Sequence, residues 1–587
     1  MLKEKDSIDS TNELTLTGKN ESVRTIAAVA KKKRSVSIGD CDSLQSRIDA
    51  SVEAVSQAVS SCEKIYGVTT GFGGMANEEV SADMAVASQN NLLSFLATGA
   101  GKPIDRRHVR AAMILRANVL LRGCSGVRME IIKRLVEFFK ADAIPVVREL
   151  GSIGASGDLV PLSVIARAIT GFGQVKVQIG DSIVDGATAL PEVGFDPLEL
   201  QPKEGLAIIN GTSFSSAIAA NAVYEAQNLM AITVGTQSLM LRALLVNESP
   251  FDEFVHQQKP HPGQIWSAAV TKRWLSEGRQ STNGKPTQVQ DRYSLRCLPQ
   301  YMGPIVEGIA RVNQTVEREM NSVSDNPLSD RTSGQLYQSG NFLGQYVGVA
   351  MDDLRRFIGL MAKHLDVQIA SLVAPEFSGG LTPSLRGNDQ LPYNMGLKGL
   401  QITGNSIMPM LTYNGNPLVE HFPTHAEQFN QNVNGLSWGA ANLAWNSVEL
   451  FQHYSSVALI FAVQSLDMRA KASFGHFDGR ILIGELAQTL YSAVYDVLEC
   501  SPGQDKPFLF NDSDRWLEKD IEALHHDIRE EGIIVDAVKP ILESFEASFL
   551  SKDRLEFKPE FKPKGNFPKK TTPTTRAKSD SATGKEY

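Results

Sequence analysis

Four long stretches of helical character constrain the fold of this 587-residue chain more than any other feature. The first is rich in alanine and contains methionines, and the other three are of similar character, with apolar residues on more than one side of the expected helix. Helices that are apolar on several faces need neighbours to cover them, as in a helical bundle. The stretches are residues 205–247, 297–323, 341–373 and 434–470. The sequence therefore predicts a mainly α protein with an extended central helical bundle.

The rest of the chain supplies the expected domain boundaries. Residues 191–203 carry three prolines and are predicted to form a loop at a boundary. The start of the chain is polar, and its end is rich in Lys, Pro, Thr and Ser with few aliphatic residues, which is typical of disorder. We therefore expect a disordered N-terminus (1–23), an N-terminal domain (24–203), the central bundle with C-terminal helices (204–551) and a disordered basic tail (552–587).

Shorter elements are expected within the N-terminal domain. Apolar residues at helical spacing favour one helix between residues 41 and 66 and three more after it, and alternating residues around Gly180 favour a small hairpin. The three later helices are predicted at 82–98, 105–121 and 129–141, and the hairpin at 174–183.

Composition argues against several classes of function. A net charge of −8 and a pI near 5.8 give no reason to expect binding to nucleic acid or to a membrane surface. The cysteines are odd in number, widely spaced and without a Cys-x-x-Cys pair, which favours reduced thiols in a cytoplasmic protein. The histidines are scattered without a recognised ligand spacing, so no metal is expected. The most apolar run, 457–463, is too short to span a bilayer.

Residues 151–162, GSIGASGDLVPL, form a glycine-rich approach to an expected helix for which Asp158 is a candidate N-cap. The small residues Ala155, Ser156 and Gly157 should therefore lie in a tight loop before the helix. One interpretation is an ordinary flexible turn. The other is a reactive loop, in which the unhindered amide nitrogen of Gly157 attacks the Ala155 carbonyl. Loss of water from that ring and from Ser156 would leave an exocyclic methylidene group, which is an electrophile.

The same twelve residues resemble the active-site signature of the aromatic amino acid lyases, the family of histidine and phenylalanine ammonia-lyases. In that family the Ala-Ser-Gly tripeptide forms 4-methylidene-imidazol-5-one (MIO). The resemblance extends over roughly residues 25 to 550. It implies an N-terminal domain that carries the MIO loop, a fumarase/aspartase-like helical fold, and a homotetramer in which residues from three chains complete each active site. The length of the chain is similar to that of bacterial rather than plant members.

A second segment, 404–409, loosely resembles the Ser-rich loop of the fumarases and aspartases. Leu411 and Tyr413 stand where the Lys and Asn of that pattern should follow. The catalytic machinery of those enzymes is therefore not expected in this chain.

The glycine-rich stretch 66–74 cannot hold a stable helix and is predicted to be a mobile loop. By itself it could be an ordinary connector. The resemblance implies that it is a lid whose first residue, Tyr66, is the catalytic base. Because a tyrosine ordinarily has a pKa of about 10, we expect the pKa of Tyr66 to be lowered, for example by nearby helix amino termini.

Phe95 and Leu96 lie in the helix predicted at 82–98. Without the family resemblance, these two apolar residues would be assigned to the hydrophobic core. The resemblance implies instead that they contact the substrate ring, because a histidine replaces the Phe in tyrosine-preferring members and Ser-His is typical of histidine lyases. An apolar pair indicates a phenyl ring.

The segment 290–297, QDRYSLRC, matches a further family signature. Its charges could belong to an ordinary surface, but an arginine is a natural partner of an amino-acid carboxylate because it donates two parallel hydrogen bonds. By the resemblance, Arg296 binds the substrate carboxylate, while Gln290 and Tyr293 line the site beside the prosthetic group.

Four more residues match family positions. Asn210 corresponds to an asparagine that hydrogen-bonds in the pocket, and Phe342 to a residue packed against the prosthetic ring. Glu427 corresponds to the glutamate that faces the substrate amino group. Glu427 and Gln431 are four residues apart and are expected to share one helix face.

The resemblance as a whole implies a phenylalanine ammonia-lyase, which converts L-phenylalanine to trans-cinnamate and ammonia. The alternatives are a phenylalanine aminomutase, which would form β-phenylalanine, and a tyrosine or histidine ammonia-lyase. A catalytically inactive helical scaffold is disfavoured, because it would not need the tripeptide together with Tyr66, Arg296 and Glu427.

Overall fold

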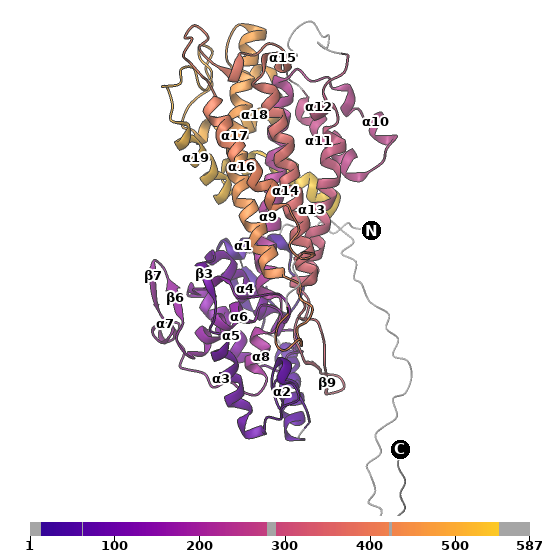
Figure 1. The fold of residues 1–587 in the computed structure, drawn as a ribbon, viewed down its shortest axis with the longest axis vertical. Coiled ribbons are helices and arrows are strands. Elements are labelled where there is room, and N and C mark those ends of the chain that lie inside the picture. The colour runs from indigo at the N-terminus through magenta and orange to yellow at the C-terminus, as the bar shows by residue number, and fades with distance from the viewer. Residues whose placement is uncertain are drawn as a thin grey trace, which may run out of the picture. The chain divides into compact units, whose positions relative to one another are not determined.

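The computed structural model describes residues 13–550, with the exception of 41, 62, 277, 279–288 and 422–424. The chain as far as Leu550 forms one compact unit (Figure 1). Buried hydrophobic side chains from both sides of the expected boundary at 203/204 belong to one core. That boundary therefore does not separate two compact domains. The tail predicted at 552–587 lies outside the described residues.

The centre of the unit is a bundle of long helices. Every residue of α9 except Tyr224 is buried, because other helices cover it on all sides. It packs against α4, α13, α14 and α17, while α16 packs against α14 and α17. The bundle helices are α9 (Ser213–Ala243), α13 (Leu298–Met320), α14 (Gln345–Leu372), α16 (Lys398–Asn414) and α17 (Ser437–Phe474). The four long stretches predicted from the sequence are confirmed as helical, and the first is broken at 210–212 between α8 and α9.

In the described part of the chain, eight shorter α-helices precede the bundle. The three predicted at 82–98, 105–121 and 129–141 are confirmed as α3, α4 and α5, with ends shifted by at most three residues. The α-helices before the bundle are α1 (Val23–Ala30), α2 (Asp42–Ser60), α3 (Ala85–Phe95), α4 (Arg106–Leu120), α5 (Met129–Lys140), α6 (Leu159–Thr170), α7 (Gly186–Glu192) and α8 (Glu204–Ile209).

The strands are short and form small separate sheets. The predicted hairpin is confirmed as β6 and β7, to which β4 adds a third antiparallel strand. β3 pairs with β5, and β8 pairs with β9, both antiparallel. The strands are β3 (Ala100–Pro103), β4 (Ala143–Pro145), β5 (Arg148–Leu150), β6 (Lys176–Ile179), β7 (Ser182–Asp185), β8 (Leu328–Asp330) and β9 (Gln335–Tyr337).

The expected disorder of residues 1–23 is wrong for residues 13–23. Strand β1 (Glu13–Leu16) pairs in parallel with β2 (Ser35–Ile38), and Leu14 and Leu16 are buried in the core. The alternation of apolar and polar residues in ELTL supplies one buried face, although four residues are too few for that pattern to stand out in the sequence.

The remaining helices surround the far part of the bundle. They are α10 (Glu253–Gln257), α11 (Pro262–Leu275), α12 (Tyr293–Arg296), α15 (Pro375–Ser378), α18 (Glu485–Val497), α19 (Leu517–Glu530), α20 (Ile533–Ala537) and α21 (Lys539–Phe545). A π-helical turn, Glu546–Leu550, ends the unit, and short 3₁₀ turns lie at Gly73–Met75, Ala82–Met84, Ser249–Phe251, Pro383–Leu385 and Gly479–Leu482.

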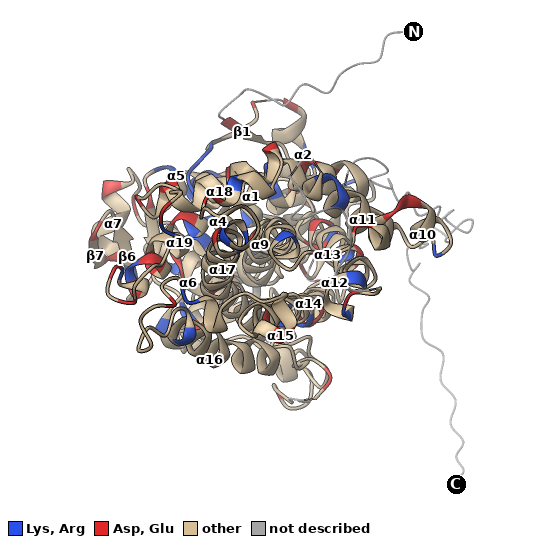
Figure 2. Ribbon diagram, turned by 90° about the horizontal axis from the view of Figure 1, so that it is seen from above, with Lys and Arg blue, Asp and Glu red and all other residues tan. Residues whose placement is uncertain are grey.

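Charged residues of both signs are mixed on the outer helices, whereas α16 carries almost no charge (Figure 2). Among the described residues, no helix is both long enough and apolar enough to be a candidate membrane span.

Candidate active site

The Ala-Ser-Gly loop lies against the turn that joins α8 to α9. Gly157 and Gly211 form a parallel bridge, and the amide of Asp158 donates to the Gly211 carbonyl at 2.8 Å. Gly157 has a φ of +68°, and a Cβ there would overlap the backbone of Gly211. Only glycine therefore fits at this position, both in conformation and in space.

The opposite side of the loop is held by two segments distant in sequence. The Gly154 carbonyl accepts from the amide of Gly344 at 2.9 Å, and the Ile153 carbonyl accepts from the amide of Leu436 at 2.9 Å. A Cβ at Gly154 would lie 2.5 Å from the hydroxyl of Ser437. The loop is therefore clamped between the α8–α9 turn and the starts of α14 and α17, and the expectation of an ordinary flexible turn does not hold.

Asn210 is hydrogen-bonded to Ser156, the middle residue of the tripeptide. Its Nδ2 donates to the Ser156 hydroxyl at 2.7 Å and to the Ser156 carbonyl at 3.3 Å. Its Oδ1 is buried and has no hydrogen-bond partner among the described residues. Asn210 is thus a donor to Ser156 with an unused acceptor, which fits a site where a further polar group is expected.

Asp158 caps a different helix from the one predicted. It precedes α6 but makes no side-chain capping bond there, and its carboxylate instead accepts from the amide of Ser215 at 2.7 Å in the first turn of α9. Burial raises the pKa of Asp158 to about 6, although hydrogen bonds from Ser215 and Ser152 oppose the rise. Asp158 therefore ties the reactive loop to the amino end of the central helix.

The glycine-rich stretch 66–74 folds over Glu427. The amide of Gly73 donates to the Tyr66 hydroxyl at 2.9 Å, and Gln89 donates to the Gly67 carbonyl at 3.0 Å. Gly73 has a φ of +57°, and a Cβ there would overlap the Glu427 carboxylate. Tyr66 and Glu427 are thus neighbours because this glycine lets the two segments approach closely.

The pKa of Tyr66 is not lowered in the single chain, contrary to the sequence-based expectation. Burial raises it, the hydrogen bond from Gly73 lowers it, and the negative charge of Glu427 raises it further. An uncompensated carboxylate beside a half-buried phenol favours the neutral phenol. Any lowering of this pKa must therefore come from groups that the single chain does not bring to Tyr66.

Glu427 and Gln431 do not share a helix face, so that prediction is wrong. Residues 427–429 have φ values of +50°, +51° and +65°, which a right-handed helix cannot contain, and Ala426 and Gln431 close the turn as an antiparallel bridge. The two side chains meet all the same. Burial raises the pKa of Glu427, and a hydrogen bond from Gln431 lowers it.

Phe95 and Leu96 lie at the end of α3, beside the lid. Leu96 is buried, but Phe95 is 47 % exposed and its ring centroid lies 6.4 Å from that of Phe72 in the lid. Phe95 is therefore not an ordinary core residue. It forms an apolar surface next to the segment that carries Tyr66.

Gln290, Tyr293 and Arg296 lie far from Ser156 in the chain's own fold. The Asp291 carboxylate accepts from the amide of Asn247 at 2.7 Å, which places α12 beside the carboxyl end of α9. Ser156 and Asn210 lie at the amino end of the same helix. A helix of 31 residues spans about 45 Å, so one chain does not bring the two groups together (Figure 1).

The side chains around α12 are available to another molecule. Tyr293 is 71 % exposed, and the Arg296 guanidinium lies 4.7 Å from the centre of its ring. Arg296 forms no salt bridge with any acidic residue in the described part of the chain, and its Nε has no hydrogen-bond partner there. Gln290 is exposed. Phe342, in contrast, is partly buried and lies two residues before Gly344, which contacts the reactive loop.

Four polar side chains beneath the loop were not predicted: Arg116, Lys203 and Asp325 are buried, and Glu319 is half-buried. Arg116 is fully buried and donates to the Asn210 carbonyl at 3.0 Å and to the Ser324 carbonyl at 3.2 Å. Glu319 accepts from the Thr212 hydroxyl at 2.7 Å, and Lys203 pairs with Asp325 at 2.8 Å. The single signal was the position of Arg116, which interrupts an otherwise apolar run of its helix. Across the residues that the structure describes, no group of three or more His, Cys, Asp or Glu could hold a metal ion.

Known proteins are similar to this chain over most of its length. The family model described as aromatic amino acid lyase matches residues 22–494. The chain is 46% identical to the phenylalanine ammonia-lyase of Nostoc punctiforme over 91% of this chain and 96% of the relative, and 40% identical to the aromatic ammonia-lyase of Loktanella atrilutea over 91% and 100%. The solved structure of the phenylalanine aminomutase from Pantoea agglomerans is similar with a TM-score of 0.78 and 29% identity, over 87% of this chain and 98% of that one.

The fold and the site together define a mainly helical enzyme that acts on carbon–nitrogen bonds. The chain belongs to the aromatic amino acid lyase family and is an aromatic amino acid ammonia-lyase.

Proposed function

We propose that this enzyme is a phenylalanine ammonia-lyase, which converts L-phenylalanine to trans-cinnamate and ammonia. The observation that carries the choice of substrate is the apolar surface of Phe95 and Leu96 beside Phe72 in the lid. These groups suit a phenyl ring and offer a ring hydroxyl or imidazole nitrogen no hydrogen-bond partner. The similarity to the Nostoc punctiforme enzyme supports the same substrate.

The loop geometry supports formation of MIO from Ala155, Ser156 and Gly157. The Gly157 nitrogen adds to the Ala155 carbonyl carbon and the ring loses one water, while Ser156 loses its hydroxyl and α-hydrogen as a second water. Asn210 holds the Ser156 hydroxyl, and its unpaired Oδ1 remains free to accept. MIO supplies an electrophile that makes the substrate amino group a better leaving group.

Tyr66 is proposed to remove the β-proton of the substrate. The Gly73 amide already donates to its oxygen, so it would stabilise the phenolate that acts as base. Glu427, beside Tyr66, would face the substrate amino group, with Gln431 fixing its carboxylate. Phe342 would pack against the prosthetic ring.

The separation of about 45 Å along α9 implies that another copy of the chain supplies Arg296, Tyr293 and Gln290. We infer a homotetramer, in which Arg296 binds the substrate carboxylate through two parallel hydrogen bonds. Arg296 has no acidic partner among the described residues, as expected of an arginine whose carboxylate partner is the substrate.

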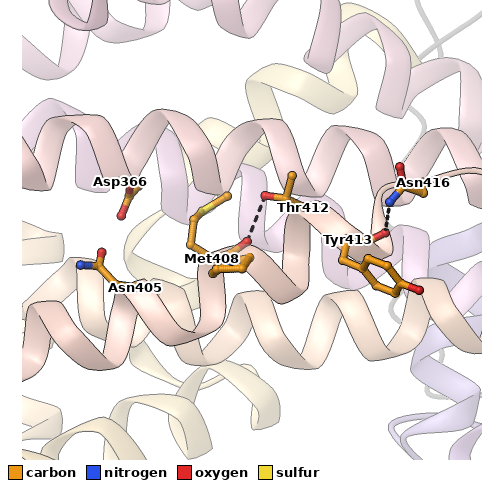
Figure 3. Close-up of a pocket in the computed structure, with 7 residues that line it drawn as sticks. Asp366, Asn405, Met408, Thr412, Tyr413 and Asn416 are labelled. Carbon is orange, nitrogen blue, oxygen red and sulfur yellow. Dashed lines mark hydrogen bonds between the residues drawn. The ribbon is translucent and has the colours of Figure 1, made fainter.

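The face of α16 supports this assembly. Ile402, Met410 and Tyr413 are all more than half exposed on a helix whose one charged residue is Lys398. A cavity of about 510 Å³ lies between α14 and α16, with Asp366, Met408 and Tyr413 among its lining residues (Figure 3). An exposed helix with a single charge beside such a cavity fits an interface between copies better than a solvated surface.

The thiols of Cys124, Cys297 and Cys500 are free, which supports a reducing environment, and we infer a cytoplasmic enzyme. We further infer that its substrate is a small molecule, that it needs no metal, and that it binds neither nucleic acid nor a membrane.

The proposed reaction is tested by product analysis. Purified enzyme incubated with L-phenylalanine should release trans-cinnamate and ammonia in equal amounts, with little β-phenylalanine, by chromatography. Accumulation of β-phenylalanine as the main product would favour an aminomutase instead. We consider this alternative because the fold is similar to that of the Pantoea agglomerans aminomutase.

The proposed ring contact is tested by Phe95→His. A buried phenol hydroxyl without a partner costs about 1–3 kcal/mol, so wild type should prefer phenylalanine over tyrosine by roughly ten- to a hundredfold in kcat/KM. The substitution should move that ratio toward tyrosine. Phe254→His, at an exposed phenylalanine on α10, should leave it unchanged. A wild-type preference for tyrosine or histidine would show that Phe95 and Leu96 do not determine which substrate ring is accepted.

A further inference from the structure

A second cavity, of about 680 Å³, lies apart from the Ala-Ser-Gly loop, between the β8–β9 hairpin and the end of α4. Arg47 reaches it from α2, Arg122 follows α4, and Arg331 lies in the hairpin turn. Arginines from three parts of the chain, distant in sequence, thus line one volume.

These arginines are not neutralised by ion pairs. None of the three forms a salt bridge with an acidic side chain in the described ranges. Asp330 also lines the cavity, but its carboxylate accepts from the Thr332 amide at 2.9 Å and the Ser333 hydroxyl at 2.7 Å within its own turn. The lining side chains therefore carry an excess of positive charge even when Asp330 is counted.

Unused donors are buried at the same place. The Nε atoms of Arg47 and Arg122 and the hydroxyl of Ser329 have no hydrogen-bond partner within the described structure. Ser329 is only 3 % exposed, yet it lines the cavity. Buried donors without partners are costly, so a group that accepts from them would lower the free energy of the folded protein.

The thiol of Cys124 lies among the three arginines without supplying a negative charge. Burial raises its pKa, although the charges of Arg331, Arg122 and Arg47 each act to lower it. All three arginines and Cys124 line the same cavity. A protonated thiol leaves their charge uncompensated.

Two of the three arginines, Arg47 and Arg122, are held in place before any ligand arrives. Arg47 donates to the Thr17 carbonyl at 2.9 Å, and its stem crosses Gly123, where a Cβ would lie 2.5 Å from Arg47 Cγ. Arg122 donates to the Asn20 side chain at 2.7 Å. The fixed donors reduce the entropy that binding would cost.

We propose that this cavity binds a small ligand with two or more anionic oxygen groups, either carboxylates or phosphoryl groups. Arginine is the residue best suited to both, because its planar fork matches the oxygens of each. The cavity volume is that of a small-molecule site, and the site is separate from the proposed ammonia-lyase reaction.

Calorimetric titration of the full-length enzyme with citrate and, separately, with inorganic pyrophosphate tests this proposal, at a constant ionic strength set with sodium chloride. At least one probe should bind to one site per chain, and the tighter of the two identifies carboxylate or phosphoryl chemistry. Arg331→Gln should weaken that binding at least tenfold, and Arg331→Lys should weaken it less. Arg331 is exposed in a turn, so its replacement should not unfold the chain.

Arg311→Gln serves as the matched control, since Arg311 is an exposed arginine of α13 without a salt bridge among the described residues. It should leave the affinity unchanged. Absence of binding by both probes, or binding equally tight in wild type and Arg331→Gln, would overturn the proposal. Both outcomes are independent of whether the enzyme deaminates phenylalanine.

Discussion

At the scale of single residues, glycines decide whether the reactive loop can exist. Gly157 combines a positive φ with direct contact to Gly211, and Gly73 allows the lid to lie on Glu427. The sequence shows that these positions are glycine, but not which of the chain's 47 glycines meets another backbone. The spatial neighbour, and not the local pattern, makes each of them indispensable.

Gly157→Ala should abolish formation of the prosthetic group. The left-handed conformation alone costs about 1–2 kcal/mol with a side chain, and the overlap with Gly211 must also displace backbone. We expect activity at least a hundredfold lower, with a lower thermal unfolding temperature, measured by steady-state assay and calorimetry.

Gly180→Ala is the matched control for that substitution. Gly180 also has a positive φ, of +58°, but nothing lies within 4 Å of the place a Cβ would take. It should lose only about 1 kcal/mol of stability and keep full activity. Equal effects of the two substitutions would mean that contact with Gly211 is irrelevant.

At the scale of elements, the sequence predicted the long helices well and the turns poorly. Helices such as 434–470 carry many apolar residues at helical spacing, so local pattern and burial agree. The turn at Glu427 contains three consecutive non-glycine residues with positive φ, which only tertiary contacts stabilise. Arg116 lies within a correctly predicted helix, but its acceptors, the carbonyls of Asn210 and Ser324, are distant in sequence.

The lid and the Glu427 turn should be coupled in their pH dependence. The Glu427 carboxylate raises the pKa of Tyr66, so removing its charge with Glu427→Gln should lower that pKa. The acidic limb of kcat/KM, where the base becomes protonated, should then move to lower pH, whatever the loss in maximal rate. The amino group of the free substrate titrates identically in both assays. A difference between the two pH profiles therefore comes from a group of the enzyme.

Gln428→Asn is the control for this comparison, because it changes the neighbouring residue without changing charge, and asparagine tolerates positive φ. Its pH profile should match that of wild type. If the acidic limb stays in place in Glu427→Gln, or moves to higher pH, then the Glu427 carboxylate does not raise the pKa of the catalytic base.

At the scale of the whole molecule, α9 separates two halves of one proposed active site. The sequence placed Ser156 and Arg296 in one site only through the family resemblance, since no local pattern reports a distance between ends of a helix. If each site combines the tripeptide of one copy with Arg296 of another, two inactive variants should complement each other.

Co-expression of Ser156→Ala with Arg296→Ala tests this arrangement. Each variant alone should be inactive, whereas mixed oligomers contain sites with one intact Ser156 and one intact Arg296. Random mixing of equal amounts should restore about a quarter of wild-type activity in the tetramer fraction from gel filtration. No recovery in mixed tetramers, or full activity in a wild-type monomer, would place the whole site in one chain.

We propose that the clamped Ala155-Ser156-Gly157 loop becomes the electrophile of this lyase, and the intact mass of the purified 63.9 kDa chain is the decisive measurement. Active wild-type protein should be lighter than its sequence by two waters without any added enzyme or metal. Ser156→Ala should be inactive and should lack that loss. A protein that converts phenylalanine to cinnamate while keeping its full unmodified mass would show that the loop does not form MIO.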